Sequence, residues 1–482
     1  MTAPRGGGAR ALPYLDHFGL AAPDFRRLLG LALDSGGDFA EIFCEYRTFA
    51  FILMEEDIIK ETAETISLGL GIRVLKGEMT GYGYANDLSW TSLSAAARTA
   101  AAIASGRGRR VRPRMVRPHA RSLRLYPVRR PAHKAGLDAK IALVQDAYAG
   151  AQAYDPAVIK VRAALGDSVQ YVCVVNSKGL LARDVRPLVK LSCTAIAERG
   201  GRKEAGYYGG GGRVGLEYFA EDLAPRTIGR ESAAEAVRLL DAREAPAGEM
   251  PVVLAPGHAG VLIHEAVGHL LEADFHRRKT SVFWNKMGAK VGADPVTIID
   301  DPTIPRFRGS YNIDDEGTVP RPTLLVERGR AVGRLQDILS ARYFKAAPTG
   351  HGRREDYSFW PIPRMSNIFI AAGGHAPEEI IASVGKGLYA EQFQGGQVED
   401  SGKFTFSVSS GYLIEGGRLT APVKQATLIG TNIDILNKIA MVGDDLRFSL
   451  QTGTCSKEGQ DVPVSDGCPT LKISDMTVGG RT

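Results

Sequence analysis

The segment HEAVGH at 264–269 carries the residues best suited to chemistry. His264 and His269 are five positions apart, and Glu265 directly follows the first histidine. In familiar zinc peptidases the motif is H-E-x-x-H, whose shorter spacing puts both imidazoles on one helical face. On a regular α-helix the longer spacing separates the rings by about 140°, so they could not bind one ion. A π-type turn aligns such residues, and Gly268 would ease the distortion. The sequence therefore predicts a metal site on a distorted helix.

A catalytic metal usually has three protein ligands and one open position. The third ligand is open among the remaining His, Asp, Glu and Cys residues, and Cys455 is one candidate because it lies in a predicted loop, QTGTCSKEGQ. The competing interpretation of Cys455 is an inert buried thiol. A fourth ligand, Cys468 or His276, would close the site. A closed site would indicate a non-catalytic, metal-stabilised regulatory or scaffold subunit.

Several charged residues could support such a site. Metal-binding histidines usually donate their second ring nitrogen to an acid, and Glu272, Asp274 and Asp314 are candidates, with surface charges or caps as the alternative. Arg353 and Arg354 could bind a substrate carboxylate. Structural ion pairs are the competing interpretation of both arginines.

The histidines lie on a predicted buried helix that begins near Ala259, after a short apolar strand and a glycine turn. Apolar periodicity and turn residues predict further helices at 22–35, 90–105 (Thr91 or Ser92 near its N-cap), 137–153 and 230–242, and strands at 39–52, 66–75, 80–84 and within 158–198. The glycine-dense segment 206–215 predicts a flexible turn or hairpin. A boundary near 245, in AREAPAGEMP, divides the chain into domains 1–245 and 246–482, the second richer in strands.

Composition places the chain among ordinary globular proteins. It has 482 residues, 44% hydrophobic and 24% charged, with a formal net charge of +6. Much of that excess lies at 107–130, which we interpret as a solvated loop, with a patch for phosphates or an acidic partner as the alternative. No nucleic-acid-binding motif accompanies it, so nucleic acid is not an expected partner. Five cysteines without a CxxC pair, no apolar span and no signal-peptide pattern predict a cytoplasmic protein without a membrane segment.

The run HEAVGHLLEADFHRRKTSVF at 264–283 resembles the core motif of TldD-type subunits in the TldD/PmbA (TldE) metallopeptidase family. Other segments are similar to the same family: GIRVLKGEMTGYGYANDLS (71–89), VVNSKGLLARDVRP (174–187), IDDEGT (313–318), PTGHGRRE (348–355), PIPRMSN (361–367), GGQVEDSGKFTFS (395–407), KQATLIG (424–430), MVGDDL (441–446) and CSKEGQDVPVSDGCPTLKI (455–473). These independent motifs cover nearly the whole chain.

The resemblance implies an α+β fold of two domains, each with a mixed or antiparallel sheet and packed helices. It implies the metal-bearing subunit, because His264, Glu265 and His269 are present, and it matches Cys455 to the family's third ligand. It also implies a dimer, formed with a TldE/PmbA-like partner subunit or as a homodimer, and unfolded peptides as substrates.

The expected metal is zinc, with iron as a competitor because the thiolate is a soft ligand. The metal would activate water for peptide hydrolysis, with Glu265 as general base.

Overall fold

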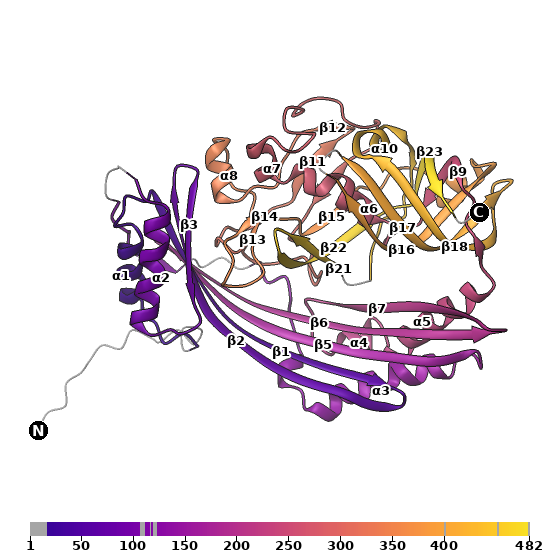
Figure 1. Cartoon of the computed structure of the whole chain (residues 1–482), viewed down its shortest axis with the longest axis horizontal. Helices are drawn as coiled ribbons and strands as arrows, with labels where there is room; N and C mark the ends of the chain where they lie inside the picture. The colour runs from indigo at the N-terminus through magenta and orange to yellow at the C-terminus, as the bar shows by residue number, and fades with distance from the viewer. Residues whose placement is uncertain are drawn as a thin grey trace, which may run out of the picture.

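The computed structural model describes residues 17–106, 111–115, 117–118, 123–399, 402–450 and 453–480. Figure 1 shows long strands from the first half of the chain sweeping beneath a compact C-terminal half. The predicted fold class is confirmed: the chain is mixed α and β, with several sheets and a strand-rich C-terminal half.

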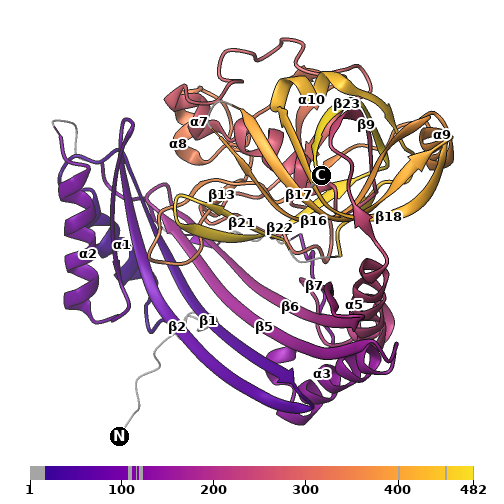
Figure 2. The same cartoon turned by 45° about the vertical axis from the view of Figure 1, so that its right-hand side comes forward.

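The first half builds one seven-stranded sheet in the order β3-β2-β1-β5-β6-β4, with β7 paired to β6. All its pairings are antiparallel except β4 with β6. The strands are β1 (Phe39–Glu55), β2 (Ile58–Lys76), β3 (Met79–Ala85), β4 (Arg117–Pro118), β5 (Val158–Asn176), β6 (Leu180–Arg199) and β7 (Arg202–Gly212). The four longest strands run about 60 Å at ~3.3 Å per residue and curve around the C-terminal half (Figure 2).

Helices cover the two ends of this sheet. They are α1 (Ala22–Ala32), α2 (Trp90–Ile103), α3 (Leu137–Gln152), α4 (Tyr218–Glu221) and α5 (Pro225–Leu240). The first two pack on β1 and β2, and α3 and α5 pack on β5 and β6. The predicted helices are confirmed, but the predicted cap of α2 was wrong, because Ser89 accepts the hydrogen bond from the backbone of Ser92.

One strand prediction and one turn prediction differ from the structure in part. The strand predicted at 66–75 is the second half of β2, which begins at Ile58. Most residues in the first half of β2 are exposed, so that half shows no alternation of apolar residues from which it could be predicted. Most of segment 206–215 belongs to β7, which forms an antiparallel hairpin with β6, so the hairpin alternative is confirmed and the flexible turn is not. A Cβ on Gly206 would lie 2.1 Å from the carbonyl oxygen of Ser232 in α5. Glycine there allows the helix backbone to lie directly on the strand.

The C-terminal half contains a five-stranded barrel and a second seven-stranded sheet. The barrel strands are β9 (Gly248–Leu254), β16 (Lys386–Val398), β17 (Lys403–Glu415), β18 (Arg418–Thr431) and β23 (Leu471–Gly479), flanked by β8 (Arg243–Glu244) and β19 (Ile439–Val442). It closes because β23 pairs with both β9 and β18.

The second sheet comprises β10 (Ile298–Asp300), β11 (Thr323–Glu327), β12 (Arg330–Ala331), β15 (Asn367–Ile370), β20 (Arg447–Phe448), β21 (Gly453–Lys457) and β22 (Gln460–Cys468). The remaining elements are β13 (Gly352–Arg353), β14 (Ile362–Pro363), α6 (Gly260–Ile263), α7 (Ala273–Arg278), α8 (Ile338–Tyr343), α9 (Pro377–Ala382) and α10 (Asn432–Lys438).

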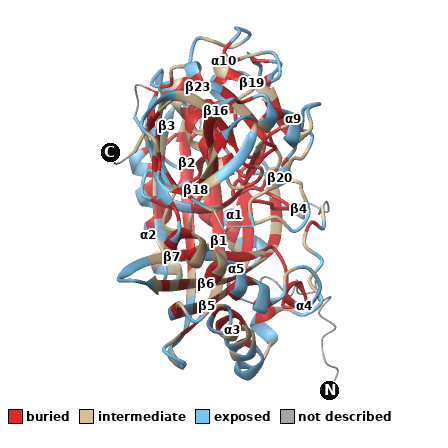
Figure 3. Ribbon diagram, turned by 90° about the vertical axis from the view of Figure 1, so that its right-hand side faces the viewer, coloured by how far each residue is buried: buried red, intermediate tan, exposed pale blue. Residues whose placement is uncertain are grey.

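One large apolar core lies between the barrel and the second sheet, and it includes the helical segment 259–271. The C-terminal half also packs against the first sheet, where Ile313 contacts Phe43, Val172 and Val174. Figure 3 shows the resulting buried band along the long strands. The site-bearing helix is therefore held on several sides by packed structure.

The basic stretch 107–130 is only partly described. Residues 107–110, 116 and 119–122 lie outside the described residues. Arg117 belongs to β4, and Arg129 forms an ion pair with Glu221. None of the described helices is both long and apolar enough to cross a membrane.

Candidate metal centre

The helix that carries the two histidines is distorted as predicted. After β9 and a turn at Gly257, α6 continues into a π-helical turn at His264–Gly268, followed by a 3-10 turn at His269–Leu271. The backbone N–H of His269 donates to the carbonyl oxygen of His264, which is the i+5 hydrogen bond of a π-helix. The predicted distortion of the helix is confirmed.

Gly268 serves this turn for a different reason from the one expected. Its φ of −56° and ψ of −54° are ordinary helical values, so no special backbone freedom is used. A Cβ at this position would lie 2.0 Å from Sδ of Met365 and 2.8 Å from Cδ1 of Ile368. Glycine is needed because β15 and the segment before it pack directly on the turn.

The structure brings His264, His269 and Cys455 together. One potential ligand atom from each lies within 4.8 Å of the others, and among the described residues this is the group of His, Cys and acidic side chains that meets that criterion. The two imidazoles contact edge to face at a centroid distance of 5.2 Å. Sγ of Cys455 lies 3.4 Å from Nε2 of His269. Residues separated by almost two hundred positions thus form one cluster.

Each imidazole is oriented by a carboxylate. Nδ1 of His264 lies 2.7 Å from Oδ1 of Asp466 in β22, and Nδ1 of His269 lies 3.0 Å from Oε2 of Glu272. In these contacts each Nδ1–H donates to a carboxylate oxygen, so that Nε2 is the ring nitrogen each histidine can offer to a metal. Glu272 was one of the predicted orienting acids. Asp466 was missed, because strand β22 reaches His264 only through long-range folding.

Cys455 lies in β21, a strand rather than the predicted loop. Burial disfavours its thiolate, yet the adjacent imidazoles hold the pKa of Cys455 well below its ordinary value of 9.0. Burial likewise opposes protonation of His269, but Glu272 and Cys455 raise its pKa to about 10. The imidazoles thus favour the thiolate form of Cys455, which is the form that binds a metal.

A buried lysine completes the support behind His269. Nζ of Lys457 lies 2.9 Å from Glu272 and 2.8 Å from Asp274, and it also donates to the carbonyl oxygen of Pro363. Burial opposes ionisation of Glu272, but Lys457 and His269 lower its pKa to about 2. Asp274 thus acts on the site only through Lys457.

Three other predicted residues lie outside the cluster. Asp314 accepts backbone hydrogen bonds from Glu316, Thr318 and Gly352, so it organises a loop rather than a histidine. Arg354 forms a 2.9 Å ion pair with Glu41 of β1, as the structural interpretation expected. Arg353 donates to two backbone carbonyl groups, those of Met365 and Pro463.

Neither candidate for a fourth ligand belongs to the cluster. Both ring nitrogens of His276 are engaged, one by the carbonyl oxygen of Leu270 at 2.7 Å and one by Nε of Arg334 at 2.9 Å. The thiol of Cys468 donates to the adjacent Pro469 carbonyl, and burial raises its pKa far above the ordinary range. Among the described residues the cluster thus offers three ligands, the number typical of an open catalytic site.

Glu265 lies on the same π turn and faces open space. Its Oε2 is 3.7 Å from Nε2 of His269, and its side chain is 29% exposed. A cavity of about 140 Å³ borders Glu265 and His264, and its walls also include Tyr207 of β7, Thr454 and Asp466. A carboxylate on that wall can accept a proton from a molecule in the cavity.

The donor set fits a zinc-type ion. It offers two imidazole nitrogens, whose partner nitrogens are held by carboxylates, and one thiol in a setting that favours the thiolate. Such borderline and soft donors suit zinc.

Comparison with known proteins identifies the family. Residues 40–104 match the model of PmbA/TldA metallopeptidase domain 1, residues 130–240 the central domain and residues 247–480 the C-terminal domain. Over 452 residues the chain is 42% identical to the metalloprotease TldD homolog of Haemophilus influenzae, covering 92% of this chain and 93% of that protein. The chain belongs to the PmbA/TldD metallopeptidase family.

Further relatives agree with this membership of the PmbA/TldD family. The zinc metalloprotease TldD homolog of Saccharolobus solfataricus is 32% identical over 239 residues, which cover 48% of this chain and 52% of that protein. TldE from Thermococcus kodakarensis has the same fold, with a TM-score of 0.73, 18% identity, and coverage of 95% of this chain and 100% of that one. A Thermotoga maritima structure, solved as a proposed modulator of a DNA gyrase, has a TM-score of 0.77, 22% identity, and coverage of 95% and 99%.

Proposed function

We propose that this protein is a zinc-dependent peptidase that hydrolyses unfolded or unstructured peptides. The observation that carries the proposal is the π turn, which places His264, Glu265 and His269 together beside Cys455. Membership of a metallopeptidase family supports it.

In this proposal His264, His269 and Cys455 hold the metal, and the name of one relative supports zinc. Iron would compete for the thiolate. When bound, the metal supplies Lewis acidity toward water and the scissile carbonyl group. Asp466 and Glu272 keep the imidazoles in the tautomer that presents Nε2.

Glu265 is the proposed general base. Its carboxylate accepts a proton from the attacking water in the cavity and then delivers it to the amine that leaves. Partial exposure of Glu265 suits this role, because substrate and water must reach its oxygen atoms. Its position directly after His264 places the carboxylate in a neighbouring sector of the site.

One strand beside the proposed metal centre lacks a second strand partner among the described residues. Among the described strands, β21 pairs only with β22, and β21 carries Cys455. An extended peptide could hydrogen-bond to such a strand with little dependence on its side chains. That mode favours unfolded chains over folded proteins.

We further propose that the chain works as a dimer, either with a TldE/PmbA-like partner or with a second copy, in the cytoplasm. The likeness in fold to TldE supports a related partner. We also propose a domain boundary near 245, because β8 at 243–244 already pairs with β18 of the C-terminal half.

A hydrolysis assay tests the proposed function. Wild type, Glu265→Gln and chelator-treated protein are incubated with an unstructured peptide, with and without a co-expressed partner, and bound metal is quantified in each sample. We expect cleavage only by wild type, with metal retained in Glu265→Gln. Equal cleavage by wild type and variant would refute Glu265 as base. Retained metal without cleavage under any condition would favour a non-catalytic, metal-stabilised subunit.

A further inference from the structure

A second cavity lies where the first sheet meets the C-terminal half, and its walls are rich in arginine. Its volume is about 270 Å³. The guanidinium groups that line this arginine pocket belong to Arg47, Arg186, Arg213, Arg308, Arg353 and Arg354. They come from β1, β6, the segment after β7, the loop near 308, and the β13 region, so the pocket exists only in the folded chain.

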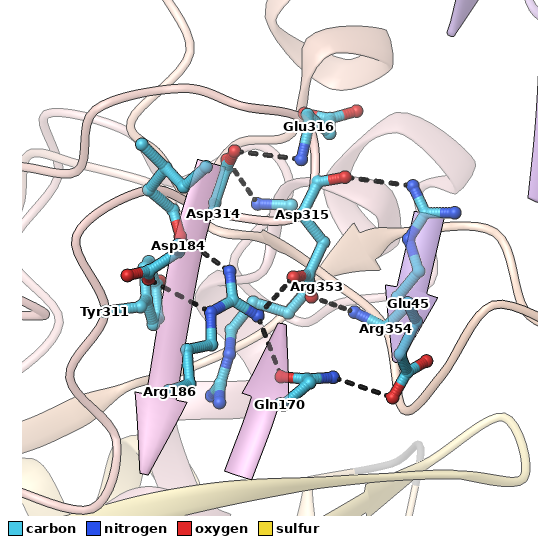
Figure 4. Close-up of polar contacts among 12 residues, drawn as sticks. Glu45, Gln170, Asp184, Arg186, Tyr311, Asp314, Asp315, Glu316, Arg353 and Arg354 are labelled. Carbon is cyan, nitrogen blue, oxygen red and sulfur yellow. Dashed lines mark hydrogen bonds and ion pairs between the residues drawn. The ribbon is translucent and has the colours of Figure 1, made fainter. Parts of the chain in front are cut away.

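Two of these arginines have carboxylate partners within the protein. Arg186 pairs with Asp315 at 2.6 Å and with Asp184 at 3.2 Å (Figure 4), and Arg354 pairs with Glu41. Those two cations are neutralised by the fold itself.

The other four arginines have no ion pair with a described residue. Arg213 and Arg353 are each about 95% buried and donate only to backbone carbonyl groups. Arg308 donates to the carbonyl oxygen of Gly453 at 2.8 Å. Arg47 has no hydrogen bond to any described residue. Burial, together with neighbouring arginines, lowers the pKa of Arg213 to about 9 and that of Arg308 to about 10. Cations held this way are stabilised by a bound anion.

The acids on the pocket wall do not supply that anion. Asp315 is committed to Arg186, and Asp314 is held by backbone N–H groups while burial raises its pKa. Glu355 accepts from the backbone N–H of Asp461, which is itself exposed. The pocket therefore carries excess positive charge.

The arginine pocket adjoins the proposed metal centre. Thr454, directly before Cys455, lines both this pocket and the cavity beside His264 and Glu265. The carbonyl oxygen of Gly453 accepts a hydrogen bond from Arg308 of the arginine pocket, and Gly453 itself lines the cavity beside His264 and Glu265. One extended peptide can therefore reach both.

We propose that the arginine pocket binds a carboxylate of the peptide substrate, supplied by its C-terminus or by an acidic side chain. This inference rests on the proposed peptidase function. A guanidinium group binds a carboxylate through two parallel hydrogen bonds, and a rigid buried cluster fixes the ligand's position as well as its charge. Anchoring one carboxylate would set the register of the chain along β21 and hence which peptide bond lies at Glu265.

Direct binding tests the proposal without requiring cleavage. A fluorescent hexapeptide of alanine and glycine ending in glutamate is titrated into the metal-loaded Glu265→Gln protein. Three matched probes carry a C-terminal amide, glutamine in place of glutamate, or both changes. We expect the doubly neutral probe to bind about tenfold more weakly or worse, the size of a lost charge-assisted hydrogen bond. Loss on amidation alone assigns the terminal carboxylate, and loss with glutamine alone assigns the side chain.

Variants of Arg47 assign the effect to the pocket, because this partly exposed residue has no hydrogen bond or ion pair with a described residue to lose. In the same background, Arg47→Gln should reduce the preference for the acidic over the neutral probe by about tenfold. Arg47→Lys should keep part of that preference, since it keeps the charge without the paired geometry. Arg162→Gln, an exposed arginine of β5 that lines neither cavity, is the control.

Equal binding of acidic and neutral probes would overturn the inference, as would an equal loss of both probes in Arg47→Gln. The probe comparison in the Arg47-containing protein stands even if an Arg47 variant folds poorly. The two proposals fail separately. Charge-dependent binding without any cleavage by wild type would refute the peptidase alone. Cleavage without dependence on the carboxylates would refute the arginine pocket alone.

Discussion

Replacement of Asp466 should weaken metal binding in graded steps. Its carboxylate lies 2.7 Å from Nδ1 of His264, and the two side chains are only 10% and 3% exposed. A hydrogen bond to a charged group contributes ~1.5–3 kcal/mol, and loss of a carboxylate behind a metal-binding histidine typically lowers affinity roughly 10- to 100-fold. Asp466→Asn keeps an acceptor and loses the charge, so we expect about a tenfold loss. Asp466→Ala also loses the acceptor, so its metal affinity should fall roughly 100-fold, the upper end of that range.

The assay is a competition titration of metal-free protein against a chelator of known zinc affinity. Asp444→Asn serves as the matched control, because Asp444 is an exposed aspartate of the same half of the chain. It should bind zinc like the wild type. If both Asp466 variants also match the wild type, the assignment of His264 as a ligand oriented by Asp466 is wrong. A loss of the same size in the two variants would show that the charge of Asp466, rather than its shape or its hydrogen-bond acceptor, is what supports metal binding.

Three further perturbations have defined outcomes. Gly268→Ala forces a methyl group against Met365. It should lower the free energy of unfolding by about 1–3 kcal/mol and reduce zinc affinity. An unchanged thermal unfolding temperature would contradict the close packing at Gly268. Lys457→Met removes the buried cation that Glu272 and Asp274 share and should lower the free energy of unfolding by about 3–5 kcal/mol in chemical denaturation. A stabilised variant would show that the lysine is dispensable. Burial lowers the pKa of His276 from 6.5 to about 4, so the unfolded chain binds this proton more readily. The stabilisation by neutral His276 is complete above pH 6.5 and is lost as the pH falls toward 4, by at most ~3 kcal/mol. The free energies of unfolding of wild type and His276→Gln should therefore differ in their pH dependence between pH 6.5 and 4. Parallel pH profiles would refute the lowered pKa of His276.

The sequence predicted the local features of the site because they depend on neighbouring residues. The i+5 spacing of His264 and His269 requires a π turn if both are to meet, and the structure contains that turn. Glu272 follows His269 by three positions, within reach across one helical turn, and it was predicted as an orienting acid. Cys455 was only one candidate on residue type, and it became the matching position through the family resemblance.

Features that depend on long-range pairing were not accessible. Asp466 reaches His264 only because β22 lies beside β15 in the second sheet, and no local pattern encodes that pairing. Closure of the barrel depends on β23 pairing with β18 as well as β9. Asp314 was a wrong candidate, because the acidic segment IDDEGT lies at the junction with the first sheet rather than at the histidines. There its neighbours Asp315 and Glu316 form ion pairs with Arg186 and Arg73. Burial of a charge at an interface looks the same in sequence as burial at an active site.

X-ray absorption at the zinc edge tests the central claim most directly. Zinc-loaded wild type, Cys455→Ser and a matched Cys468→Ser control would be compared, with zinc bound per chain measured in each. We predict one sulfur ligand at about 2.3 Å together with imidazole nitrogens at about 2.0–2.1 Å. The sulfur signal should vanish in Cys455→Ser and persist in Cys468→Ser. A spectrum without sulfur, or one unchanged by Cys455→Ser, would contradict the assignment of His264, His269 and Cys455 as the metal centre.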